Sequence, residues 1–154
     1  MFQKLRREDR KMEDLETIKL LESGNFGVLS TINENGYPYG VPLSYVYLNK
    51  NIYFHSAMRG NKISNILINN KVSFCIVGES TPLPEEFSMS YKSVIVFGKA
   101  DEVDGEEKKE ALLGLVAKYS SQFIENGKKY IENDEHTTKV IKLNIEHICG
   151  KKRD

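Results

Sequence analysis

Hydrophobic and polar positions along the chain follow two different periods. Apolar residues first recur at helical spacing, at Leu15, Ile18 and Leu21. This pattern predicts a short helix that Asp14 caps and Gly24 ends. From residue 26 onward the period changes to two, which is typical of β-strands with one face buried.

Three strands separated by short turns are predicted in this second region. They span residues 26–32, 37–48 and 52–57. The connections between them are only a few residues long, and consecutive strands joined in this way usually pair with one another. We therefore expect a three-stranded antiparallel meander.

The remaining chain adds helices and further strands. Ile63, Ile66 and Leu67 mark one face of a short predicted helix, and a longer helix is predicted from Asp104 to Tyr119. Further strands are expected at 72–78, 88–103 and 140–148, with weak helix and loop at 120–135. The fold class that follows is mainly β with helices (β+α): a split β-barrel with Greek-key connections, about six mostly antiparallel strands and short peripheral helices.

Length and charge restrict the domain organisation and the partners. The chain has 154 residues, which fits a single domain over 1–154 that begins with a basic arm at 1–12. Its 22 Lys and Arg balance 22 Asp and Glu, so no overall field attracts a polyanion, and nucleic acid is not an expected partner. The basic arm and the basic residues 151–153 are expected to be solvated tails.

The chain offers no pattern for a disulfide framework, a metal site or a membrane span. Its two cysteines, Cys75 and Cys149, lie in apolar, strand-like surroundings and are expected to be buried thiols. The first residues are charged, and the longest apolar runs are far too short to cross a bilayer. A cytoplasmic location without a membrane partner is the expectation.

Pro42 is the first candidate for a functional feature. It lies within an apolar, β-prone run, yet proline donates no hydrogen bond to a sheet. We expect it to interrupt strand pairing and to leave backbone groups between Val41 and Ser44 free for a flat heterocycle such as a flavin. An ordinary edge strand or a bulge explains the proline equally well.

A second candidate feature follows the predicted strand 52–57. Lys62 lies in the first turn of a predicted helix, where free amides and a nearby cation bind phosphate well, and Ser56 offers a hydroxyl donor. His55 can exchange a proton near neutral pH. The alternatives are a solvated surface lysine and a histidine that only makes structural hydrogen bonds.

Other chemical motifs are absent from the sequence. It contains no GxGxxG, GxSxG, HExxH or CxxC pattern, and Asn61 precedes Lys62 where a Walker loop has glycine. The chain therefore has no recognisable nicotinamide fingerprint, hydrolase elbow or metal site.

Several segments together resemble a known family. They are RREDRKM, GVLST, NGYPYGVPLSYVY, IYFHSAMRGNKISNI, YKSVIVFGKADEV and HICGKK, in this order. The combination resembles the nitroimidazole-resistance (Nim) family, a branch of the pyridoxamine 5′-phosphate oxidase-like split-barrel flavoproteins. The resemblance runs from Arg6 to Lys152.

The resemblance implies an FMN-binding homodimer with flavin sites at the interface between subunits. FAD is the other cofactor left open. His55 corresponds to the family's proposed catalytic histidine, and a role in placing cofactor or substrate fits it as well. The cofactor-binding residues that the resemblance implies are Val41, Pro42, Leu43, Ser44, Tyr45, His55, Ser56, Asn61, Lys62, Tyr91, Lys92 and Ser93, the last three from the partner subunit.

The expected function is that of an FMN-dependent oxidoreductase acting on a small molecule, with nitro compounds as candidate substrates. In such an enzyme the flavin carries the electrons, and the protein supplies orientation and electrostatics. Two alternatives remain open, because one fold supports many functions. One is a flavin-binding or storage module without turnover, and the other is a haem-binding split-barrel protein.

Overall fold

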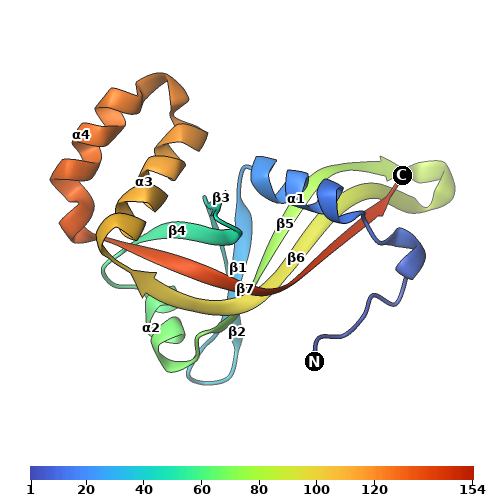
Figure 1. Ribbon diagram of the computed structural model, residues 1–154. Helices are drawn as coiled ribbons and strands as arrows, with labels where there is room; N and C mark the ends of the chain where they lie inside the picture. The colour runs from blue at the N-terminus through green and yellow to red at the C-terminus, as the bar shows by residue number, and fades with distance from the viewer.

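The computed structural model describes residues 1–154 and contains one mainly antiparallel sheet with four α-helices around it (Figure 1). The strands are β1 (Gly27–Ile32), β2 (Pro38–Leu43), β3 (Val46–Leu48), β4 (Asn51–Ala57), β5 (Lys71–Leu83), β6 (Ser88–Val103) and β7 (Thr138–Arg153). The helices are α1 (Asp14–Ser23), α2 (Asn61–Ile68), α3 (Gly105–Tyr119) and α4 (Ile124–Asp134), with short 3-10 turns at 8–10, 84–86, 121–123 and 135–137. The β+α class is therefore confirmed.

The sheet has seven strands, not six, in the order β2-β1-β5-β6-β7-β4-β3. All six strand pairs are antiparallel. The outermost strands β2 and β3 do not pair with each other, so the sheet does not close into a barrel. The chain crosses over between β4, which lies beside β7, and β5, which lies beside β1, as in a Greek key.

The predicted meander over 26–57 is wrong. β2 and β3 come from the single strand predicted at 37–48, and they lie at opposite edges of the sheet. The strand breaks at Ser44 and Tyr45 because the Tyr45 side chain enters the core. Its hydroxyl donates to the Leu21 carbonyl, and its ring packs edge-on against Phe74 at a centroid distance of 4.9 Å. This aromatic anchor redirects the chain from one edge to the other.

Two apolar clusters hold the sheet and the helices together. The larger one fills the inside of the curved sheet and includes Leu29, Phe54 and Phe74, all fully buried. The smaller one fixes the α3 and α4 pair over β3 and β4 through residues such as Leu115 and Ile131. Figure 1 shows this helix pair at one end of the sheet, while the β5 and β6 ribbon extends at the other end.

The C-terminal end is more ordered than the solvated tail predicted from its charge, whereas none of residues 1–11 of the basic arm is buried. β7 continues to Arg153 rather than ending at residue 148. Lys152 reaches Glu16 on α1 at 2.8 Å, and Arg153 reaches Glu86 at 2.7 Å. In the basic arm Met12 is buried. Because β7 pairs with β6 to its end, Lys152 and Arg153 are positioned to form these ion pairs.

Three further features of the fold bear on the sequence predictions. Most of the segment 120–135, predicted as weak helix and loop, forms the regular helix α4 (Ile124–Asp134) after a 3-10 turn at 121–123, and α4 buries Ile131. Cys75 and Cys149 are free thiols that are half-buried rather than buried. None of the helices combines the length and the apolar character that a membrane crossing requires.

Candidate functional site

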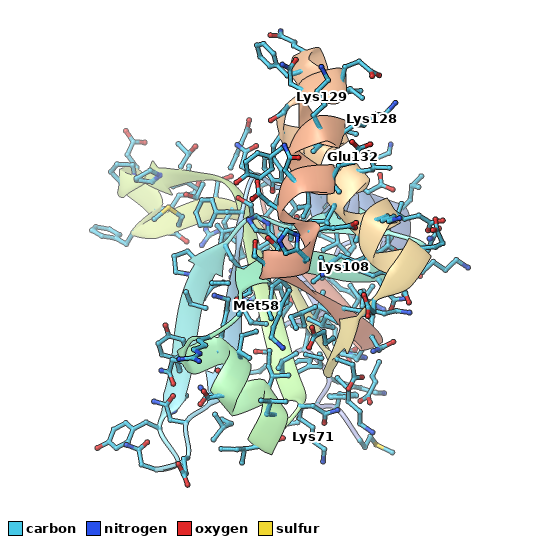
Figure 2. All side chains as sticks on the ribbon, turned by 90° about the vertical axis from the view of Figure 1, so that its left-hand side faces the viewer. Met58, Lys71, Lys108, Lys128, Lys129 and Glu132 are labelled. Atoms are coloured by element: carbon cyan, nitrogen blue, oxygen red, sulfur yellow. The ribbon has the colours of Figure 1, made fainter.

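The candidate site begins at the end of β4. In this strand Ile52, Phe54 and Ser56 face the core, and His55 points to the outer side. His55 pairs in register with Val140 of β7. The loop 58–60 then leads into α2, and Figure 2 shows Met58 of this loop on the N-terminal side of that helix. Of the predicted cofactor-binding residues, His55 and Ser56 therefore lie at the end of β4, and Asn61 and Lys62 lie at the start of α2.

The loop ends in a conformation that requires glycine. Gly60 has φ 148° and ψ 167°, a region that is essentially restricted to glycine. It is the residue before α2, and no side chain caps the helix there. The first amides of the helix, those of Asn61, Lys62 and Ile63, therefore have no acceptor within it. Together they form a partly positive surface that suits an anion.

Lys62 adds a full positive charge beside these amides. The side chain is half-buried and forms none of the ion pairs in the structure. Although His55 is exposed, desolvation by its surroundings lowers its pKa below the ordinary value, and the positive charge of Lys62 lowers that pKa further. Lys62 therefore lies close enough to His55 for its charge to act on the imidazole.

Ser56 provides the test of whether an oxygen-rich ligand fits here. Its side chain is 4% exposed, and its Oγ is the one buried side-chain polar atom without a hydrogen-bond partner. Leaving such a group unpaired costs about 1–3 kcal/mol. A serine hydroxyl, free helix amides and an unpaired lysine are the kinds of donor that a phosphate group needs, so the residue types at this strand end and helix start fit a phosphorylated cofactor.

Pro42 does not interrupt strand pairing, which corrects the prediction made for it. β2 pairs with β1 continuously from Pro38 to Leu43, and Pro42 lies opposite Val28. The backbone groups of Pro38, Gly40 and Pro42 point to the same side of β2, away from β1. Because proline has no N–H group, only Gly40 can donate a hydrogen bond on this free edge. The expected edge strand is present, and the break comes afterwards at Ser44.

The break is held by a helix that the sequence did not connect with it. The backbone N–H of Tyr45 donates to the Tyr119 hydroxyl at 3.1 Å, and the Tyr45 carbonyl accepts from Lys118 Nζ at 3.0 Å. The same ammonium group lies 3.8 Å from the centre of the Tyr45 ring. Burial lowers the pKa of Lys118 to about 8. The end of α3 therefore fixes the chain at Tyr45, the last residue of the segment from Val41 to Tyr45.

The three residues predicted on β6 lie away from these groups in a single chain. In the sheet register, Val140 of β7 pairs with His55 of β4 on one side and with Val103 of β6 on the other. Ser93 lies ten residues before Val103 on β6. That separation is on the order of 30 Å along the strand. Lys92 forms an ion pair with Glu16 at 2.9 Å, and the Tyr91 ring lies below Lys151. One subunit does not bring Tyr91, Lys92 and Ser93 to the site, and their contribution from a partner subunit stays a prediction.

The buried face of α2 differs from the predicted one. Ile63 and Ile66 are buried as expected, but Leu67 is 80% exposed. The buried position is taken by Asn65, whose Nδ2 donates to Thr31 Oγ1 at 2.9 Å and to Asn33 Oδ1 at 2.8 Å. This amide anchors α2 to β1 and to the turn that follows it. No apolar pattern in the sequence marks it.

Comparison with known proteins identifies one family. Residues 13–152 match the family model described as Pyridoxamine 5′-phosphate oxidase. No curated protein matches the sequence.

Several solved structures share the fold at low sequence identity. The conserved hypothetical protein Rv2991 from Mycobacterium tuberculosis is 17% identical, with a TM-score of 0.83 over 97% of this chain and 90% of that one. The FAD and heme binding protein from Mycobacterium smegmatis is 13% identical, with a TM-score of 0.79 over 96% of this chain and 74% of that one. A candidate 5-nitroimidazole antibiotic resistance protein from Bacteroides thetaiotaomicron is 22% identical, with a TM-score of 0.72 over 90% of this chain and 83% of that one.

Proposed function

The chain belongs to the pyridoxamine 5′-phosphate oxidase family, and we propose that it binds a flavin through its FMN part and works as an oxidoreductase on a small molecule. The observation that carries this proposal is the buried hydroxyl of Ser56. It has no partner, and it lies on the strand that leads into the uncapped start of α2 beside the unpaired Lys62. An anion held there satisfies all three groups at once.

The phosphate end and the ring end of the flavin are assigned to different segments. Ser56, Asn61 and Lys62 bind the phosphate through a hydroxyl, free amides and an ammonium group. Val41 to Tyr45 lines the ring, since this segment lies on an unpaired sheet edge and is fixed at Tyr45 by the end of α3. A rigid support of this kind lowers the cost of ordering the cofactor.

His55 is proposed as the residue that handles a proton. Its pKa is lowered by desolvation and by the charge of Lys62, which favours the neutral imidazole. A phosphate dianion beside Lys62 offsets the charge that contributes to this shift, so His55 takes up a proton more readily once the cofactor is bound. The proton on the imidazole nitrogen is then available to a substrate. The bound flavin supplies the electron transfer, and the chain supplies position, charge and the proton.

We propose that two copies of the chain form the complete site. Tyr91, Lys92 and Ser93 lie too far from His55 to share a site within one subunit, and the β5 and β6 ribbon near them exposes apolar side chains. Phe87 at its tip is 98% exposed, and Val77 is 62% exposed. Burying these groups against a second copy places β6 of one subunit beside the flavin of the other. Light scattering tests this, and a monomer that binds flavin with full affinity contradicts it.

Nitro compounds are the proposed substrates, in line with the Nim-type motifs. The likeness to the Bacteroides thetaiotaomicron protein supports this choice only at the level of the fold. In the reaction, a bound flavin would transfer electrons from an added reductant, and the nitro group would take up electrons and protons to become an amine while both of its oxygens leave as water. Chromatography of a 5-nitroimidazole incubated with flavin-loaded protein and a reductant detects the amine.

The decisive experiment is an absorption spectrum of the purified protein, followed by mass analysis of the ligand released on denaturation. Flavin bands and a flavin mass are expected. A colourless protein that takes up neither FMN nor FAD contradicts the proposal, and a Soret band without flavin bands identifies a haem protein instead. Flavin that stays oxidised with every donor and nitro acceptor reduces the function to binding or storage.

A further inference from the structure

A polar hollow lies next to the proposed phosphate site. It has a volume of about 510 Å³ and is bounded by one face of α2 and by the turn between β1 and β2. Figure 1 and Figure 2 both show this turn beside α2. The lining residues are Asn33, Glu34, Asn35, Asn61, Ser64, Asn65 and Ile68. Asn61 belongs to both places, so the hollow continues directly from the start of α2.

The floor of the hollow is preorganised. Asn65 is 3% exposed, and its amide is fixed by hydrogen bonds to Thr31 and Asn33. The turn itself is closed by hydrogen bonds from Gly36 N–H to the Asn33 carbonyl at 2.8 Å and from Asn33 N–H to the Tyr37 carbonyl at 2.8 Å. Rigid walls allow a ligand to bind without first ordering the protein.

The chemistry of the lining selects the kind of ligand. No lysine or arginine lines the hollow, so it is not suited to a further phosphate group. Asparagine amides match the paired donor and acceptor of a purine edge, and the Glu34 carboxylate accepts hydrogen bonds from ribose hydroxyls. Ile68 supplies an apolar surface for a base ring. The hollow therefore suits a neutral nucleoside whose phosphates lie at the start of α2.

We propose that this hollow is an adenosine subsite and that the physiological cofactor is FAD rather than FMN. This inference rests on the proposed flavin site, because it uses Lys62 and the α2 amides to hold the phosphates. FMN ends at its single phosphate and leaves the hollow empty. In FAD the chain continues from that phosphate through a second one to adenosine, which the hollow accepts.

The test compares the affinities of apoprotein for FMN and FAD by quenching of flavin fluorescence. Each hydrogen bond to the nucleoside contributes about 1 kcal/mol, so two or more make FAD bind at least about tenfold more tightly than FMN. Ser64→Trp fills the hollow from α2 and is expected to remove this preference while leaving FMN affinity unchanged. Glu34→Gln is expected to reduce the preference for FAD in part. This second variant keeps the test valid if Ser64→Trp does not fold.

Leu67→Trp is the matched control, because Leu67 is 80% exposed on the same helix and does not line the hollow. It must keep the ratio of the two affinities. Equal affinities for FMN and FAD overturn the adenosine subsite and leave the proposed flavin site standing. Binding of neither flavin overturns both. AMP binding to FMN-loaded protein, without any preference for FAD, assigns the hollow to a separate nucleotide and also overturns the inference.

Discussion

The hydroxyl of Tyr119 lies between the two backbone groups of Tyr45, 3.1 Å from its nitrogen and 3.0 Å from its carbonyl oxygen. The two residues are 74 positions apart in the sequence. Tyr45 has left both neighbouring strands, so its backbone has no partner in the sheet. Tyr119, together with Lys118 on the Tyr45 carbonyl, replaces that partner and fixes the last residue of the segment proposed to line the flavin ring.

Tyr119→Phe removes this replacement. We expect a loss of about 1–2 kcal/mol in the free energy of unfolding, since an N–H group that is only partly exposed loses its acceptor. Flavin affinity also falls, because the segment before Tyr45 becomes less ordered. Urea denaturation and flavin titration measure the two effects. Tyr130→Phe is the control: Tyr130 is 70% exposed and forms no hydrogen bond, so neither quantity should change.

Ser56→Ala separates folding from binding. Removal of an unpaired buried hydroxyl is expected to raise the free energy of unfolding of the apoprotein by about 1 kcal/mol, while it weakens flavin binding by about five- to tenfold. Denaturation of apoprotein and flavin titration give the two numbers. Ser80→Ala serves as the control, because Ser80 is an exposed residue of β5. A variant that is less stable and binds flavin normally assigns Ser56 to the core alone.

Lys62→Met tests the phosphate contact. Loss of a charge-assisted bond is expected to weaken FMN binding by roughly 1.5–3 kcal/mol. Binding of riboflavin, which has no phosphate, should remain as it is in the unmodified protein. Lys129→Met on α4 (Figure 2) is the control for a general loss of positive charge. Unchanged FMN affinity returns Lys62 to an ordinary surface lysine.

The pKa of His55 reports its distance from Lys62. Desolvation is the larger cause of the lowered value and Lys62 the smaller one. In Lys62→Met the His55 pKa is therefore expected to rise but to stay below its ordinary value. NMR titration of the imidazole protons measures this. An unchanged pKa indicates that the two side chains are too far apart in solution to share a ligand.

Lys118 makes stability depend on pH. Its pKa falls from 10.5 to about 8 on folding because burial disfavours the charged ammonium group. Between these values the unfolded chain binds more protons than the folded one, so the free energy of unfolding rises with pH above about 8. Thermal melts between pH 8 and 10 should show this rise. Lys118→Met is expected to flatten the profile, and an equally steep rise in that variant rules out Lys118 as its source.

Helices and strands whose formation depends on the local pattern of apolar residues could be predicted from the sequence. The apolar, β-prone runs around Phe74 and Val96 predicted two strands of the core, and the stripe from Ala111 to Leu115 predicted α3. The order of the strands could not be predicted, because 37–48 alternates without a break and nothing local shows that Tyr45 turns inward. The helical spacing also placed Leu15 on the apolar face of α1, but Leu15 is 69% exposed.

The candidate site divides in the same way. His55, Ser56 and Lys62 were predicted because a strand end followed by a helix start is a local signal, and the structure has that strand end and helix start at these residues. Tyr119 and Lys118 act on Tyr45 through contacts formed only in the folded chain. Asn65 was missed because a buried amide on a helix is recognisable only once its partner Thr31 is known.

The two prolines of β2 have a consequence beyond the single molecule. An outer strand with a full row of donors invites another chain to extend the sheet, and such growth leads to fibres. Pro38 and Pro42 leave only Gly40 to donate along that border. The chain can therefore expose this border to solvent or to a small guest without recruiting further copies of itself into a polymer.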